Sequence, residues 1–194
     1  AQECRALVPD GMAPDAFDTR FGWVADLHRA AAECLDPVRL RSEPPHTVYE
    51  GLKRLSFPEC PLRITNLGRA NDAARIAESL ARLLEAPGSF EEKFEAARFP
   101  QAGMVTVSEL LCAAKPARFC IRNTAILRAA AKVTPLYGLN ALRELPYAEF
   151  LDLMRELARI LTDRFAALGH GPWAEEHRFL ALYAALVGSD ATVS

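Results

Sequence analysis

Residues 147–168 read YAEFLDLMRELARILTDRFAAL, and this stretch decides the class of fold. Its apolar residues recur every three or four positions, the spacing that places side chains on one face of an α-helix. The apolar residues are Phe150, Leu151, Leu153, Met154, Leu157, Ile160, Leu161 and Phe165. Gly169 to Pro172 interrupts the pattern. We therefore predict a long amphipathic helix over 147–168.

The same periodicity recurs along the rest of the chain, and strand patterns are nearly missing. The proline-rich stretch 37–45 is predicted to be a loop. Further helices are predicted at 15–35, 46–57, 71–86, 89–97, 106–114, 124–133, 136–145 and 173–187. We expect an all-α fold in which residues 1–194 form a single compact domain of eight or nine short helices.

Several polar residues stand where helices are predicted to begin. Asp15 and Asn123 are predicted N-caps, because a side-chain oxygen there accepts a free backbone N–H of the first turn. Asn71 is expected to open the helix that follows it. Residues 89–92 (Ser-Phe-Glu-Glu) and 106–109 (Thr-Val-Ser-Glu) match the capping box, in which the glutamate also reaches back to the cap.

Size and composition exclude several classes of protein. A chain of 194 residues buries about two-thirds of its unfolded surface, and 51% hydrophobic and 25% charged residues exclude a disordered charged tail. The longest apolar run, Phe179 to Val187, is far short of the roughly 20 residues that a membrane span needs. No secretory signal is visible at the start of the chain, and we expect no membrane partner.

The cysteines do not form a metal-binding pattern. Their number is odd and none belongs to a CxxC pair, so we expect no metal site and no cofactor. Reduced thiols suit a cytoplasmic protein, whereas a thermophilic cytoplasm would also be compatible with disulfides. The five residues are Cys4, Cys34, Cys60, Cys112 and Cys120.

Recognisable catalytic motifs are absent from the sequence, which does not favour an enzyme. It contains no Gly-x-Ser-x-Gly elbow, phosphate-binding P-loop or dinucleotide fingerprint. Residues 170–177 contain two histidines and two glutamates, but they fit a turn between two helices with an acidic first turn.

Charge is unevenly distributed along the chain, although the net charge is only −2. Residues 98–143 contain seven basic residues and one acidic residue, Glu109, a local charge of +6. Such a segment is a candidate phosphate-binding surface. A solvated helical face, or pairing with acidic helices, would explain it equally well. The basic residues are Arg98, Lys115, Arg118, Arg122, Arg128, Lys132 and Arg143.

Within this basic segment, residues 99–107 (FPQAGMVTV) resemble the helix-hairpin-helix motif of DNA glycosylases, which reads roughly L-P-G-V-G-x-x-T-A. Pro100, Gly103 and Thr106 match that motif. Residues 116–128 (PARFCIRNTAILR) are similar to the family's following segment, P-x-x-F-x-V-D-T-H-V-x-R-V. The resemblance spans about 35 residues and implies a hairpin whose backbone N–H groups approach a DNA phosphate.

The departures from the family concern its catalytic residues. The family's catalytic aspartate falls on Asn123, and an amide is not a general base. The lysine of its bifunctional members falls near Met104 or Val105, neither of which is a nucleophile. The first hairpin glycine is Gln101. The resemblance therefore implies the scaffold and the DNA contact without the glycosylase reaction.

The sequence thus leads to a hypothesis and two alternatives. The hypothesis is a non-catalytic helical domain that binds the phosphate backbone of double-stranded DNA without strong sequence readout. The alternatives are a protein-interaction or assembly subunit, and a glycosylase or lyase with unaligned catalytic residues around a pocket at Asn123. The predicted DNA-binding residues are Gly103, Met104, Thr106, Lys115, Arg118, Arg122 and Arg128.

Overall fold

The computed structural model describes residues 14–55, 60, 67, 72–97, 102–134, 136–169 and 173–187. These residues form ten α-helices and a short 3₁₀ helix and contain no strand, which confirms the all-α class. The helices are α2 (Pro14–Cys34), α3 (Pro37–Ser42), α4 (Pro45–Lys53), α6 (Ala73–Glu85), α7 (Phe90–Ala97), α8 (Met104–Ala114), α9 (Thr124–Val133), α10 (Leu139–Glu144), α11 (Tyr147–Ala167), η1 (Glu175–His177) and α12 (Arg178–Val187).

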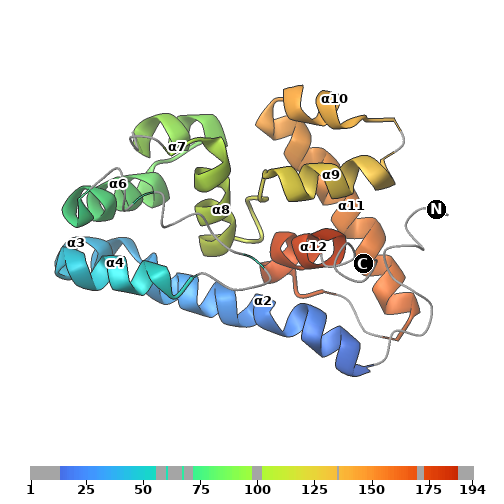
Figure 1. The fold of residues 1–194 in the computed structure, drawn as a ribbon, viewed down its shortest axis with the longest axis horizontal. Helices are drawn as coiled ribbons and strands as arrows, with labels where there is room; N and C mark the ends of the chain where they lie inside the picture. The colour runs from blue at the N-terminus through green and yellow to red at the C-terminus, as the bar shows by residue number, and fades with distance from the viewer. Residues whose placement is uncertain are drawn as a thin grey trace.

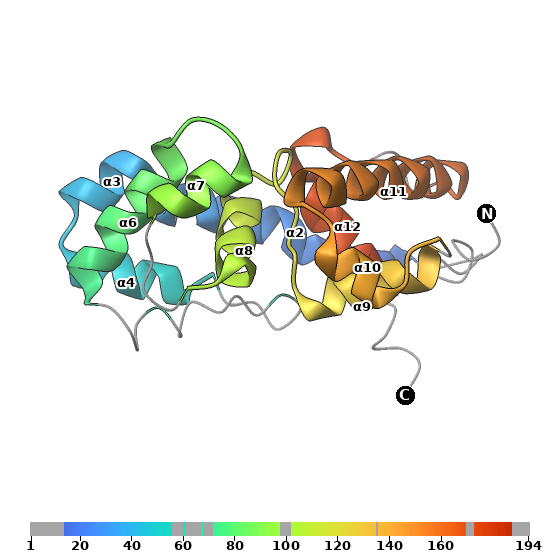
Figure 2. The same cartoon turned by 90° about the horizontal axis from the view of Figure 1, so that it is seen from above.

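The helices form two groups that lie side by side (Figure 1). One group contains α3, α4, α6 and α7, and the other contains α9, α10, α11 and α12 (Figure 2). The long helix α2 runs past both groups, and α8 lies between them. Helix α8 packs against α2 and α12, and a direct contact between α7 and α11 joins the two groups.

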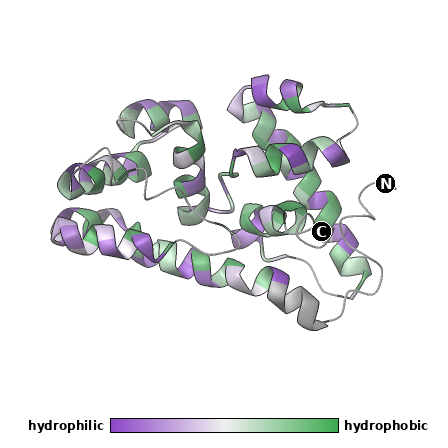
Figure 3. Cartoon of the chain, viewed as in Figure 1, coloured by the Kyte–Doolittle hydropathy of each residue, from purple (hydrophilic) through white to green (hydrophobic). Residues whose placement is uncertain are grey.

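Buried side chains from both groups belong to one hydrophobic cluster. Helix α12 lies within it and is hydrophobic around most of its circumference (Figure 3). Every residue from Phe179 to Leu186 is buried. A helix that is apolar on all sides must be surrounded by protein, so α12 forms the centre of the second group.

The sequence prediction missed one helix, α3, in the proline-rich stretch 37–45 that we expected to be a loop. The side chain of Asp36 accepts a hydrogen bond of 2.9 Å from the backbone N–H of Arg39 and so caps this helix. Pro37 is its first residue, where proline loses no hydrogen bond and its fixed φ suits a helix. Pro45 begins α4 in the same way.

Two of the predicted helix starts are confirmed. The hydroxyl of Ser89 accepts from the backbone N–H of Glu92 at 3.2 Å, and the Glu92 carboxylate accepts from the Ser89 N–H at 2.7 Å. The side-chain oxygen of Asn123 accepts from the backbone N–H of Ile126 at 3.1 Å and caps α9. Both starts were visible in the sequence because capping depends on residues only three positions apart.

The other predicted starts are wrong or displaced. Helix α8 begins at Met104 with Gly103 as its N-cap, so the expected capping box at 106–109 lies inside the helix. Thr106 and Glu109 are both buried within the helix, so neither stands at its end. Asp15 lies within α2, which begins at Pro14. Asp72 rather than Asn71 caps α6, and Asn71 itself lies outside the described residues.

Two further expectations concern membranes and thiols. No helix within the described ranges is both long and apolar enough to cross a membrane.

Cys34, Cys60, Cys112 and Cys120 are free thiols, and Cys4 lies outside the described residues. Burial raises the pKa of the Cys112 and Cys120 thiols, so both are small apolar core residues at neutral pH.

Candidate nucleic-acid interface

The basic side chains that follow α8 reach the end of α6. The Lys115 ammonium donates a hydrogen bond of 3.1 Å to the carbonyl oxygen of Leu84. The Arg118 guanidinium donates one of 3.3 Å to the carbonyl oxygen of Gly88. These carbonyls lie at or just beyond the C-terminal end of α6, where a helix has unpaired acceptors and a partial negative charge. Both side chains therefore have a role within the fold.

Lys93 of α7 adds a third cation at the same place. Its side chain is only 1% exposed, and its ammonium donates to the carbonyl oxygens of Leu83 and Ala86. Burial lowers the pKa of Lys93, and the positive charges of Lys115 and Arg118 lower it further. This cluster was not predictable from the charge pattern, because α7 lies outside the basic segment.

Arg122 is placed in the same way at the end of α10. Its Nη2 lies 3.1, 2.9 and 2.6 Å from the carbonyl oxygens of Leu142, Arg143 and Leu145. The guanidinium also lies 5.2 Å from the ring centroid of Phe150, and the residue is 8% exposed. Arg122 was predicted to contact DNA, but in the structure its guanidinium hydrogen-bonds the carbonyl oxygens at the C-terminal end of α10.

Residues 119–122, between α8 and α9, are buried and held by side chains. The Tyr147 hydroxyl accepts from the Cys120 N–H at 2.9 Å and donates to the Cys120 carbonyl at 2.7 Å. The Ser108 hydroxyl accepts from the Arg122 N–H at 2.9 Å and donates to the Val105 carbonyl at 2.8 Å. These bonds satisfy a buried, non-helical backbone and set the position of α9.

Asn123 joins three helices. Its oxygen caps α9, and its amide nitrogen donates to the carboxylate of Glu109 on α8 at 3.3 Å. The side chain of Asn123 also hydrogen-bonds Tyr183 of α12. Burial raises the pKa of Tyr183 to about 12, although the bond to Asn123 opposes the shift. The predicted pocket residue is thus part of a packed polar contact.

Gly103 and Asn123 do not converge on a common cleft. Gly103 is exposed at the start of α8, whereas Asn123 contacts Glu109, six residues and about 9 Å further along that helix. Gly103 has a φ of −77°, so its conformation does not require glycine. Met104 is 40% exposed and Thr106 only 6%. The connection from α7 to α8 includes residues 98–101, which lie outside the described residues.

Four basic side chains of this segment are exposed: Arg118, Arg128, Lys132 and Arg143. Arg128 and Lys132 lie four residues apart on α9 and therefore share a face. Arg143 belongs to α10, which packs against α9. Our sequence-based site omitted Lys132 and Arg143, although both were in the basic segment.

Exposed carboxylates are absent from the described residues of 102–143, and Glu144 of α10, which is exposed, follows directly. Glu109 is the one acidic residue of 98–143, and it is 2% exposed. From residue 102 to residue 143, every exposed charged side chain that the structure describes is basic. Neither Arg128 nor Arg143 has an ion-pair partner among those residues. We call Arg128, Lys132 and Arg143 the α9–α10 basic face.

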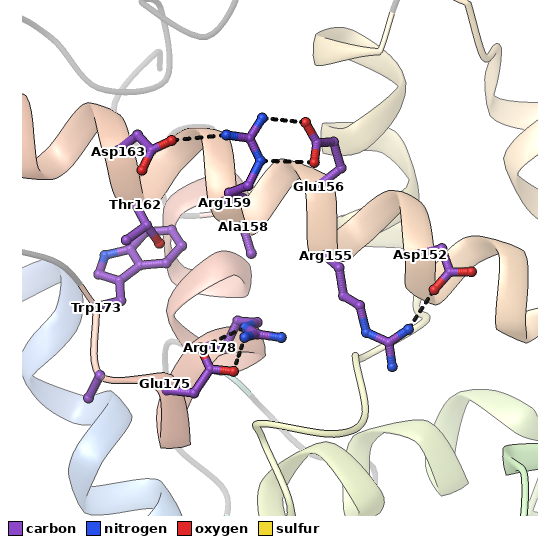
Figure 4. Close-up of a pocket in the computed structure, with 11 residues that line it drawn as sticks. Asp152, Arg155, Glu156, Ala158, Arg159, Thr162, Asp163, Trp173, Glu175 and Arg178 are labelled. Carbon is purple, nitrogen blue, oxygen red and sulfur yellow. Dashed lines mark hydrogen bonds and ion pairs between the residues drawn. The ribbon is translucent and has the colours of Figure 1, made fainter.

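An open pocket of about 400 Å³ lies elsewhere, between α11, η1 and α12 (Figure 4). The three arginines that line it are all ion-paired. The Arg155 guanidinium, for example, lies 2.5 Å from the Asp152 carboxylate. Because each positive charge has a carboxylate beside it, this pocket is a poor phosphate site.

Comparison with known proteins adds no further constraint. No protein-family model, curated protein or solved structure matches the chain.

Proposed function

We propose that this protein is a non-catalytic helical domain that binds the phosphate backbone of double-stranded DNA without strong sequence readout. The α9–α10 basic face provides the cations. The start of α8 at Gly103 and Met104, which no side chain caps, provides a second contact for a phosphate.

One observation carries the proposal: the described surface from 102 to 143 carries exposed basic charges and no exposed carboxylate. Arg128 and Arg143, for which the described residues provide no ion-pair partner, retain their charge toward an approaching phosphate. Four predicted residues are no longer part of the proposed interface, because they are engaged or buried within the fold: Thr106, Lys115, Arg118 and Arg122.

The test measures the affinity of the protein for a short labelled DNA duplex by fluorescence anisotropy, at increasing salt concentrations. Each phosphate contact contributes about −0.9 to the slope of log affinity against log salt concentration. We expect the triple variant Arg128→Gln, Lys132→Gln, Arg143→Gln to bind more weakly, with a slope reduced by about 3. Gly103→Ala is compatible with the fold, because nothing lies within 4 Å of the added carbon. This variant should bind the duplex more weakly without changing the slope of log affinity against log salt concentration.

The matched control is the double variant Arg155→Gln, Arg159→Gln, which removes exposed but ion-paired arginines from α11. This control should bind like the wild type. Absence of duplex binding at low salt, or an equal loss in the control, would overturn the proposal.

Neither alternative function has a comparable observation in its favour. A protein-interaction subunit would be favoured by a contiguous apolar patch. The described large hydrophobic residues that are exposed, Val38, Met104 and Leu136, lie on separate elements. A glycosylase or lyase would require room around Asn123, whose side chain is engaged by α8 and α12.

A further inference from the structure

Two histidines from different elements of the fold contact each other. His28 lies on α2 and His177 on η1, and their ring centroids are 5.0 Å apart at an interplanar angle of 84°, an edge-to-face arrangement. Both residues are half-buried. Because histidine gains its positive charge between about pH 5 and pH 8, a modest fall in pH changes this contact from two neutral rings to two cations.

The charges around the two rings determine how the pair responds to protons. Partial burial lowers the pKa of His28, and the positive charge of His177 lowers it further, whereas Glu176 opposes both effects. Helices α4, α8 and α12 also pack against α2, but the charges that act on His28 are those of His177 and Glu176. The Glu176 carboxylate lies 3.7 Å from Nε2 of His177, and the next carboxylate, Glu175, is paired with Arg178. One carboxylate therefore faces two rings and offsets only one of two positive charges.

The segment 173–177 is attached to α2 at two points. One point is the histidine pair, and the other is Trp173, whose ring centroid lies 6.1 Å from that of Phe21. Helix α12, which follows, is anchored separately, because Phe179 is fully buried and its N–H donates to the carbonyl of Pro116 at 2.9 Å. A movement of the segment away from α2 therefore leaves α12 in place.

The same segment forms one wall of the open pocket beside α11, since Trp173, Ala174 and Glu175 line it (Figure 4). We propose that His28 and His177 form a pH-dependent switch, which holds residues 173–177 against α2 while the rings are neutral and releases them when both are protonated. Release moves one wall of the pocket and opens it further. This inference is independent of the proposed DNA binding, because neither histidine belongs to the α9–α10 basic face.

The direction of the pH effect follows from the pKa of His28, which the folded contact holds below its ordinary value of about 6.5. The released segment then binds a proton more readily than the attached one, so the contact is fully kept above about pH 6.5 and is lost as the pH falls below it. Glu176 stabilises the protonated pair in the attached state. Removing its charge should therefore move release to higher pH.

The experiment measures quenching of tryptophan fluorescence by acrylamide in the full chain, from about pH 7.5 to about pH 5. In the wild type, the quenching constant should rise several-fold as Trp173 leaves α2. Trp173→Phe isolates the signal of Trp23, which is buried on α2 and should not respond to pH. His28→Phe keeps an aromatic ring against His177 without a second charge, so its quenching should stay at the neutral-pH value. Glu176→Gln should show the rise at higher pH than the wild type.

His46 provides a matched control, because it is an exposed histidine on α4. His46→Phe makes the same substitution away from the pair and should respond to pH like the wild type. The far-UV circular dichroism of the wild type and of every variant should stay constant over this pH range, since only the segment 173–177 is released.

Three results would overturn the switch: quenching in the wild type that does not change with pH, an equal rise in His28→Phe, or a rise accompanied by loss of the helical signal. The last result would show that the whole chain unfolds in acid. The comparison of the wild type with His28→Phe requires no tryptophan variant. Because duplex binding is measured at neutral pH, where the pair is intact, failure of this inference and failure of the proposed function are distinguishable.

Discussion

The segment from Lys115 to Arg143 and the outer face of α11 both contain several arginines, but their surroundings are opposite. On α11, Arg155 pairs with Asp152, and Arg159 pairs with Glu156 and Asp163, all at spacings of three or four residues. In the first segment, Lys115 and Arg122 bind backbone carbonyls of distant helices, and Arg128 and Arg143 have no ion-pair partner among the described residues.

Basic side chains therefore have three different roles in this protein. Pairs on a single helix neutralise each other and contribute little to stability. Cations at helix ends satisfy acceptors that the helix itself leaves unpaired. Arg20 has this second role at the end of α12, where its Nε donates to the Ala184 carbonyl at 3.2 Å. Arg128 and Arg143 have neither role, because they are exposed and no described residue pairs with them.

The largest effect is expected from Arg122→Ala. The substitution leaves the carbonyls of Leu142, Arg143 and Leu145 without their cation in a buried position. We expect a loss of about 3 kcal/mol in the free energy of unfolding, measured by urea denaturation. Arg122→Lys keeps the charge and should recover part of the loss. Wild-type stability of Arg122→Ala would contradict the helix-end role.

A smaller effect is expected from Asn123→Ala, which removes the cap of α9 and the hydrogen-bond donor to buried Glu109. The loss in the free energy of unfolding should be about 1–2 kcal/mol. Asn123→Ser keeps a capping oxygen and should fall between the alanine variant and the wild type. Equal losses for serine and alanine would show that the cap contributes nothing.

The smallest effect is expected on α11. Arg159→Ala removes a fully solvated partner of two carboxylates, and we expect no measurable change in the urea midpoint at moderate salt. Lowering the salt concentration should reveal any contribution, since it strengthens interactions between exposed charges. A loss as large as that of Arg122→Ala would abolish the distinction between the two regions.

Much of the fold was predictable, whereas the candidate site was predictable only in part. The periodicity of 147–168 and the caps at Ser89 and Asn123 depend on residues within one or two helical turns. The location of the positive segment was likewise visible from the residues. Which of its members face solvent was not visible, because Arg122 and Arg128 look equivalent in a list of charges.

By itself, the sequence determined that the chain is helical, where most helices lie, and that positive charge is concentrated in 98–143. The tertiary structure alone decided that Glu109 is buried, that Lys115 and Arg122 complete distant helix ends, and that Leu136 is left in water. The reason is the sequence separation over which each interaction acts, since helical propensity and capping act over three or four residues. Lys115 and Leu84, in contrast, lie 31 residues apart and meet only in the folded chain, where the C-terminal ends of α6 and α8 come together.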